Sequence, residues 1–167
     1  MRIQLKSILY SALGLMTFFS ASVLTSCKTD KCKATVCAYG GECTEDGACV
    51  CLAGYEGERC ETISRDKFKG SWNVVEDGTR SEGNGYATAI QDGTQIDQVV
   101  IRNFYNNFNE SVMATVKGDT IYIPSQVMHE NGKQYTIEGK GYVDPEGYYG
   151  LHGKLIMRYR VLLEDGS

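Results

Sequence analysis

The chain has 167 residues, a formal net charge of −4 and a charged fraction of 23%. A mildly acidic chain has no basic surface to neutralise phosphates, which argues against a nucleic-acid partner and against electrostatic docking to an anionic membrane. The 19 glycines, 11 tyrosines and only two prolines are typical of short strands joined by tight turns. The length allows one ordinary domain and one small one.

Residues 1–26 have the features of an export signal. Arg2 and Lys6 form a positive start, an apolar stretch follows from Ile8 to Val23, and the first acidic residue is Asp30. The apolar stretch of about sixteen residues is shorter than the roughly 20 that a membrane-spanning helix needs. The pattern therefore predicts a signal peptide rather than a permanent anchor. Removing its two cations changes the formal charge from −4 to −6.

A lipid attachment site is predicted directly after this segment. The run Leu24-Thr25-Ser26-Cys27 resembles the lipobox of bacterial lipoproteins. The resemblance implies that a diacylglycerol acylates the Cys27 thiol, that the peptide is cut before it, and that the new amino group is acylated too. All seven cysteines lie from position 27 to position 60, so lipidation of Cys27 leaves an even set of six. The alternative is a soluble secreted protein with one free thiol.

The lipobox resemblance implies a location in the cell envelope, with the lipid anchor in the outer membrane. Lys28 and Asp30 partly resemble the signal that sends lipoproteins of some Gram-negative groups to the cell surface, although Thr29 stands where an acid is expected. Periplasmic and surface-facing positions both stay open. Either compartment is oxidising, as the remaining cysteines require.

A six-cysteine module is predicted over residues 28–61. From Cys32 to Cys60 the spacing is C-x4-C-x5-C-x5-C-x-C-x8-C, and the module closes on Gly54-Tyr55-Glu56-Gly57. This resembles an EGF-like domain. Six cysteines allow fifteen connectivities, and the resemblance implies one of them: Cys32–Cys43, Cys37–Cys49 and Cys51–Cys60.

Disulfides suit this module better than metals do. A chain this short buries too little apolar surface to fold without covalent help. A zinc site would need C-x2-C pairs or nearby histidines, and the only histidines are His129 and His152. Calcium-binding EGF-like modules carry acidic or amide groups before the first cysteine, where this chain has only Asp30. We therefore expect no Ca²⁺ and no other metal, and a module that serves as a spacer or a protein contact.

After a short linker, residues 62–67, the pattern over residues 68–167 is that of an antiparallel β domain. Apolar and polar residues alternate with period two, most clearly in 111–117 and 151–161. Pairs such as Asp92-Gly93 and Asn131-Gly132 favour hairpin turns. The pattern predicts strands near 68–76, 86–91, 96–104, 111–117, 120–124, 134–143 and 148–162. Seven or eight such strands form a meander that closes into a small barrel or a sandwich, and Pro124 is expected at a strand end or edge.

The first of these strands carries Gly70-Ser71-Trp72, which resembles the G-x-W motif of lipocalins and lipocalin-like barrels. In that family the tryptophan plugs one end of the barrel and an arginine of the last strand packs over it. The resemblance implies this role for Trp72, with Arg158 or Arg160 as the partner. The domain, including the run from Ala114 to Pro124, is also similar to C-terminal β domains of Bacteroidetes-type lipoproteins, which implies fold more than function.

No residue pattern predicts catalysis, so we expect a non-enzymatic protein without a cofactor. His129 and His152 lack the neighbours of a nucleophile–base pair. Acids on strands, such as Glu110, Glu138 and Asp144, are usually solubility devices.

One aromatic and amide stretch, 103–109, is a candidate contact for a sugar or a peptide, through Asn103, Tyr105, Asn107 and Phe108. The alternative is a loop whose Phe104 and Phe108 plug the barrel end.

Two functional hypotheses follow. The first is a lipid-anchored envelope protein whose two modules mediate contact with a protein or a glycan. The second is a lipocalin-like binding protein for a small apolar ligand. The volume of the barrel interior discriminates between them, because a ligand-binding barrel keeps several hundred Å³ open. A barrel filled by its core side chains has no such space; these would be Phe68, Trp72, Ile101, Val116 and Leu155.

The anchor prediction is tested by Cys27→Ala. We expect the wild-type protein to sediment with membranes and the variant to lose the anchor, because two or three acyl chains at roughly 0.8 kcal/mol per buried methylene make release negligible. Cell fractionation followed by immunoblotting measures the distribution. A variant that stays in the membrane fraction would contradict the lipid anchor.

Overall fold

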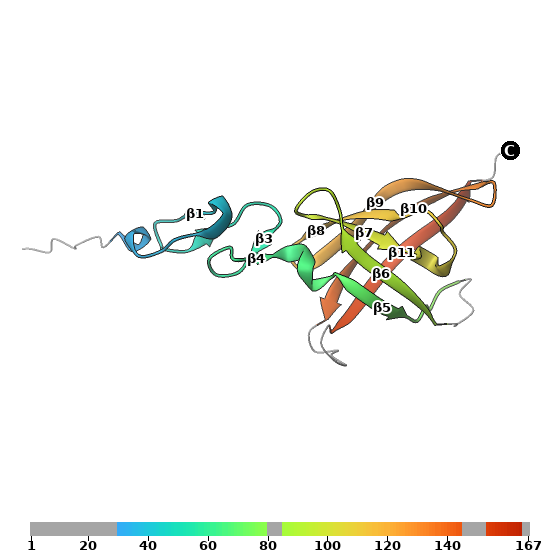
Figure 1. Ribbon diagram of the computed structural model, residues 1–167, viewed down its shortest axis with the longest axis horizontal. Helices are drawn as coiled ribbons and strands as arrows, with labels where there is room; N and C mark the ends of the chain where they lie inside the picture. The colour runs from blue at the N-terminus through green and yellow to red at the C-terminus, as the bar shows by residue number, and fades with distance from the viewer. Residues whose placement is uncertain (1–29, 80–84, 145–152, 165–167) are drawn as a thin grey trace, which may run out of the picture. The chain divides into compact units, whose positions relative to one another are not determined.

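The computed structural model describes residues 30–79, 85–144 and 153–164. The predicted signal peptide and Cys27 lie outside these residues. Lys31–Ser167 form one compact unit, and its strands follow one another in chain order (Figure 1).

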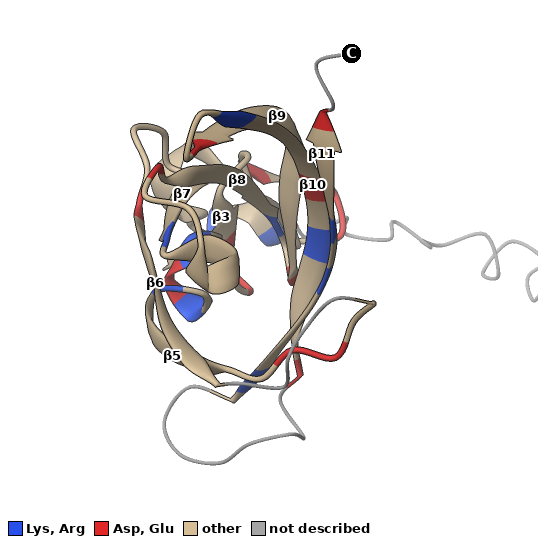
Figure 2. Cartoon of the chain, turned by 90° about the vertical axis from the view of Figure 1, so that its right-hand side faces the viewer, with Lys and Arg blue, Asp and Glu red and all other residues tan. Residues whose placement is uncertain are grey.

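The β domain is a single antiparallel sheet of seven strands in the order β11-β10-β9-β8-β7-β6-β5. Each strand pairs with its sequence neighbour, and Figure 2 shows the sheet curled around an interior. The strands are β5 Gly70–Val74, β6 Tyr86–Asp92, β7 Gln98–Arg102, β8 Val112–Lys117, β9 Thr120–Glu130, β10 Lys133–Asp144 and β11 Lys154–Glu164. The predicted mainly β meander is confirmed, with seven strands near the expected places.

The period-two pattern of the sequence decides which side chains face the interior. Val112, Ala114 and Val116 of β8 are buried, whereas Thr115 and Lys117, which follow two of them, are exposed. The same alternation in the other strands builds one hydrophobic core. Its buried members are Phe68, Ile90, Val99, Ile101, Phe104, Phe108, Val112, Ala114, Val116, Ile121, Ile123, Met128 and Ile137.

Strand β9 corrects the expectation that Pro124 ends a strand. The strand continues to Glu130, and the register against β10 slips where Ile137 pairs with Gln126 but Gly139 pairs with Ile123. A β-bulge is a place where a sheet tolerates proline, because the missing N–H breaks no ladder bond there. The side chain of Gln126 then takes the place of a backbone partner for β8. Its Oε1 accepts from the Met113 N–H at 3.0 Å and its Nε2 donates to the Met113 carbonyl at 2.8 Å.

Two inward-facing glycines allow β11 to approach β10 closely. A Cβ on Gly139 would lie 2.6 Å from Tyr159 Cβ, and one on Gly141 would lie 2.7 Å from the Ile156 carbonyl oxygen. Glycine in a strand is typical of bends at barrel corners. The curled sheet nevertheless stays a half-barrel, since among the described residues β5 and β11 pair with no strand on their outer edges.

A 3₁₀ turn at residues Ser64–Lys67, η3, connects the disulfide module to β5. The Arg65 guanidinium Nη1 donates to the carbonyls of Gly93, Gln95 and Gln98 in the β6–β7 connection. Lys67 Nζ lies 2.6 Å from a carboxylate oxygen of Glu56 and 2.5 Å from one of Asp119. The predicted linker is therefore folded, and these contacts of Arg65 and Lys67 hold it against the β domain and against the last hairpin of the module.

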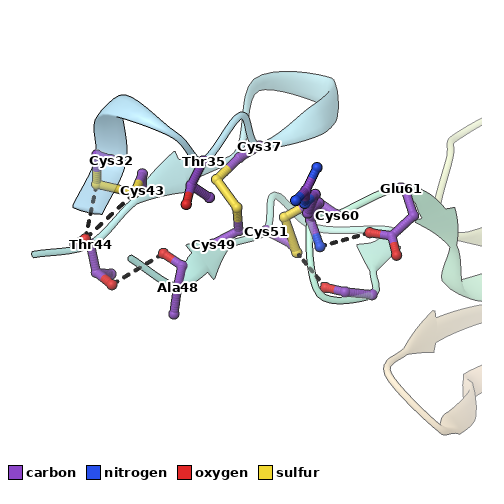
Figure 3. Close-up of a disulfide and its surroundings, with 12 residues drawn as sticks. Cys32, Thr35, Cys37, Cys43, Thr44, Ala48, Cys49, Cys51, Cys60 and Glu61 are labelled. Carbon is purple, nitrogen blue, oxygen red and sulfur yellow. Dashed lines mark hydrogen bonds between the residues drawn. A yellow bond between two sulfur atoms is a disulfide. The ribbon is translucent and has the colours of Figure 1, made fainter. Parts of the chain in front are cut away.

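The six-cysteine module contains only short elements. They are the 3₁₀ turns η1 Lys31–Lys33 and η2 Ala38–Gly40, and the hairpins of β1 Glu42–Cys43 with β2 Cys49–Val50 and of β3 Tyr55–Glu56 with β4 Thr62–Ile63. Its disulfides are Cys32–Cys43, Cys37–Cys49 and Cys51–Cys60, the same pairs that the EGF-like resemblance implies (Figure 3). Loops of 9 to 12 residues make each bridge worth about 3 kcal/mol in the chain-entropy model.

The C-terminal part of this module packs against the β domain at Gly54. Gly54 is buried, has φ +88°, and accepts a hydrogen bond from the Ser64 N–H at 2.9 Å. A Cβ at this position would lie 2.7 Å from a methyl carbon of Ile96. The glycine is thus required both by its backbone conformation and by the closeness of the β6–β7 connection.

We predict that Gly139→Ala destabilises the β domain by roughly 1–3 kcal/mol, because the new methyl group overpacks the contact with Tyr159. Lys140→Ala on the exposed face of the same strand is the matched control and should change stability by about 0.5 kcal/mol or less. Urea unfolding measures both. Equal stabilities of the two variants would show that β11 does not depend on the glycine.

Candidate functional site

A cavity of about 1130 Å³ lies between the two free edges of the sheet and is here called the seam cavity. Its walls are formed by β5 with the segment 75–79, by Tyr86, Thr88 and Ile90 of β6, and by β11. Both inward-facing and outward-facing residues of β11 line it, including Met157 and Arg158. The cavity therefore extends from the interior to the exposed edge of the strand.

Five aromatic residues line the seam cavity: Trp72, Tyr86, Phe104, Tyr105 and Tyr159. The ring of Tyr159 is central to this set, with its centroid 4.7 Å from that of Phe104 and 6.2 Å from that of Tyr105. Trp72 is held by its indole N–H, which donates to the Phe68 carbonyl at 2.8 Å. The wall is thus largely apolar, with ring faces and edges fixed by packing.

The Glu76 carboxylate, on the segment after β5, is one of the charged groups in this wall. Its Oε1 accepts a hydrogen bond from the Tyr86 hydroxyl at 2.6 Å and a second one from the Tyr159 hydroxyl. Tyr86 belongs to β6 and Tyr159 to β11, two strands that are not neighbours in the sheet. One carboxylate therefore bridges the open side of the half-barrel.

The same contacts shift the acidity of both phenols. Burial raises the pKa of Tyr86 and Tyr159 above its ordinary value, and the hydrogen bond to Glu76 raises the pKa further. Both groups are therefore protonated donors throughout the physiological range, which keeps the bridge intact there.

The aromatic loop after β7 has two kinds of side chain. Phe104 and Phe108 are 4% and 3% exposed, and Phe108 packs edge-on against Tyr135 with centroids 5.4 Å apart. They plug the interior, as the alternative interpretation of this loop proposed. Tyr105 lines the seam cavity, and Asn103 and Asn107 are exposed. The 3₁₀ turn here, η4 Phe104–Asn106, has left-handed backbone at Tyr105 and Asn106.

Hydrogen bonds from its asparagines hold this loop in place. The Asn103 amide donates to the Ala87 carbonyl at 2.7 Å. Asn109 donates to the buried Glu130 carboxylate from its backbone N–H at 3.0 Å and from its side chain at 3.1 Å. Three N–H contacts from one residue thus satisfy the Glu130 carboxylate.

The remaining predicted residues are dispersed. Trp72 and Arg158 both line the seam cavity, and a packing contact between them stays a prediction. His129 is exposed beside Glu110, Glu138 pairs with Arg160 on the outer face, and His152 lies outside the described residues. No catalytic grouping was predicted from these residues, and they lie apart.

Sequence reasoning missed Glu76. The alternation in β6 and β11 could have placed Tyr86 and Tyr159 on the inner face, but Glu76 follows a strand and precedes the turn pair Asp77-Gly78. An acid in such a place is usually solvated, and no local pattern shows that it turns inward.

A second hollow of about 480 Å³ lies over the β9 bulge and the outer face of β10 and β11. It is lined by exposed polar groups such as Lys140 and Arg158 and by the Glu138–Arg160 ion pair. Ligand sites are mostly apolar with a few placed polar groups, so the seam cavity fits that description better.

No protein-family model, no curated protein and no solved structure matches this chain. The fold and site themselves define a disulfide-stapled module joined to an antiparallel half-barrel with a cavity at its open side. In the described part of the chain, no helix is both long and apolar enough to cross a membrane. The same residues contain no group of three or more His, Cys, Asp or Glu side chains that could hold a metal ion.

The raised tyrosine pKa values predict an alkaline limit of stability. Unfolded tyrosines ionise near pH 10, whereas the folded state retains the protons of Tyr86 and Tyr159 to a higher pH. The stabilisation from these protons is complete below about pH 10 and is lost as the pH rises toward the folded pKa. Ultraviolet difference titration should show two tyrosines that ionise only with unfolding. Ionisation of every tyrosine in one early step would contradict the bridge.

Proposed function

We propose that this chain is a non-enzymatic, lipid-anchored binding protein of the cell envelope, and that the seam cavity holds a small, largely apolar ligand. One observation carries the proposal: beside its packed core, the curled sheet leaves an open volume of about 1130 Å³ at the seam. Ligand sites of drug-sized molecules occupy about 300–1000 Å³ and are lined mainly by apolar and aromatic side chains. The seam cavity is slightly larger than this range, and its lining is mainly apolar and aromatic.

The chemistry of the wall supports binding rather than catalysis. A general base or acid works best with a pKa near the operating pH, whereas the pKa of both cavity phenols is raised further from neutrality. The six cysteines of the module are joined in disulfides and supply no thiolate.

The disulfide module supports an anchoring role. Its last hairpin is fixed to the β domain by the Glu56–Lys67–Asp119 contacts and by the packing of Gly54 on Ile96. Only four residues separate the predicted lipid site at Cys27 from Cys32 in the chain. We propose that the module is a stiff spacer between the membrane and the binding domain.

A second candidate function is contact with an extended peptide. Among the described residues the outer edges of β5 and β11 are unpaired, and an unpaired edge is the place where a peptide adds as a further strand. This candidate corresponds to the protein-interaction hypothesis.

The ligand proposal is tested with the compact unit, residues 31–167, and the neutral apolar dye Nile red. We expect saturable fluorescence enhancement with one site per chain. Met157→Phe narrows the cavity and should weaken binding by about tenfold, a loss of about 1.4 kcal/mol. Ile156→Phe, on the opposite face of β11 and outside the cavity lining, is the matched control and should bind as the wild type does.

Absence of saturable binding would sink the small-ligand proposal and leave the peptide candidate. Equal binding by the two variants would show that the dye sits elsewhere. Native mass spectrometry of protein purified from cells provides a second readout, because a co-purified small molecule would support the proposal directly.

A further inference from the structure

The negative charge of Glu76 has no cationic partner within the described residues. The carboxylate is half-buried, and its hydrogen bonds come from two neutral phenols that both donate to Oε1. Within those residues its Oε2 accepts no hydrogen bond and no Lys or Arg side chain forms an ion pair with it. A carboxylate in low-dielectric surroundings is stabilised when an opposite charge is near.

The basic residues of the cavity wall all lie on β11, and none of them forms an ion pair with Glu76 in the described part of the chain. Lys154, Arg158 and Arg160 occupy the exposed positions of β11, which alternate with the inward-facing Leu155, Met157 and Tyr159. Arg160 pairs with Glu138 on the neighbouring strand. All three also line the outer part of the seam cavity, where it opens at the edge of β11, whereas Glu76 is bound to phenols of its inner part.

Glu130, a buried carboxylate of the domain, differs from Glu76 in this respect. Glu130 has both of its oxygens engaged by N–H groups of Asn109. Glu76 has only one oxygen engaged, and it belongs to the lining of a cavity. The Glu130 carboxylate therefore has a structural role, whereas the Oε2 atom of Glu76 can still accept a contact from a ligand.

Aromatic rings surround this carboxylate. Tyr86 and Tyr159 touch it directly, and Trp72, Phe104 and Tyr105 line the same cavity. Ring faces attract ammonium groups, most strongly when water is excluded, and sets of rings are the usual receptors for alkylated ammonium ions. An acid beside such rings adds direct charge attraction.

We propose that the seam cavity selects ligands with a cationic amine or quaternary ammonium head group and an apolar tail. The head group lies against Glu76 and the rings of Tyr86 and Tyr159, and the tail lies along the apolar side chains Ile90, Ile101 and Leu155. This inference rests on the proposed function, since it names the chemical class of ligand for the same cavity.

The test uses three probes with the same alkyl chain: decyltrimethylammonium, decanol and decanoate, each below its aggregation limit. Trp72 is the single tryptophan of the chain and lines the cavity, so its fluorescence reports binding directly. We expect decyltrimethylammonium to bind about tenfold more tightly than decanol, as a cation–π contact of about 1–2 kcal/mol implies. Decanoate should bind more weakly than decanol, because its charge repels Glu76.

Variants assign the effect to Glu76. Glu76→Gln should reduce the preference for the cation by about tenfold and leave decanol binding unchanged. Glu110→Gln makes the same change of charge at an exposed position outside the cavity lining and should keep the preference. The comparison of the three probes on the wild-type protein needs no variant, so it decides the question even where Glu76→Gln fails to fold.

The outcomes separate the two proposals. If decanol binds and the cation binds no better, the proposed ligand class is wrong while the small-ligand function stands. If none of the probes binds, both are wrong. If the cation is preferred and Glu76→Gln keeps that preference, the assignment to Glu76 is overturned.

Discussion

The open side of the sheet is the constraint on which the rest of the β domain depends. A sheet that curls without closing has two free edges and an interior that its own side chains must protect. The tyrosine–carboxylate bridge joins β6 to β11 through Glu76 where no backbone ladder does. The buried Phe104 and Phe108 fill the interior beside it. The three side chains of this bridge also line the cavity at the seam.

Curvature and cavity have a common origin in a few special residues. Gly139 and Gly141 let β11 lie close on β10, and the bulge at Pro124 bends β9 while Gln126 repairs the lost pairing to β8. These residues help to curl the strands β7 to β10 around the core. The two terminal strands, β5 and β11, each pair with only one neighbouring strand, and the candidate binding site lies between them.

The disulfide module and the β domain reach stability in different ways. The module has hardly any core and relies on three covalent bridges. The β domain has a continuous core of aliphatic and aromatic side chains. The contacts of Arg65 and Lys67 at their junction make the connection short and stiff, which is consistent with the proposed role of the module as a spacer.

Local pattern was enough to predict the strands, because alternation along Val112–Lys117 and turn pairs such as Asn131-Gly132 are properties of neighbouring residues. The cysteine spacing likewise led to the module and, through its resemblance, to the pairs that the structure contains. Pro124 misled the prediction, because only the register with β10 shows that the strand bulges and goes on. The seam cavity and the inward turn of Glu76 could not be predicted, since they depend on the distance between β5 and β11, which are 84 residues apart from Gly70 to Lys154. The sequence by itself determined the elements and their order, and only the tertiary structure decided that the sheet stops short of closure and leaves a carboxylate among aromatic rings.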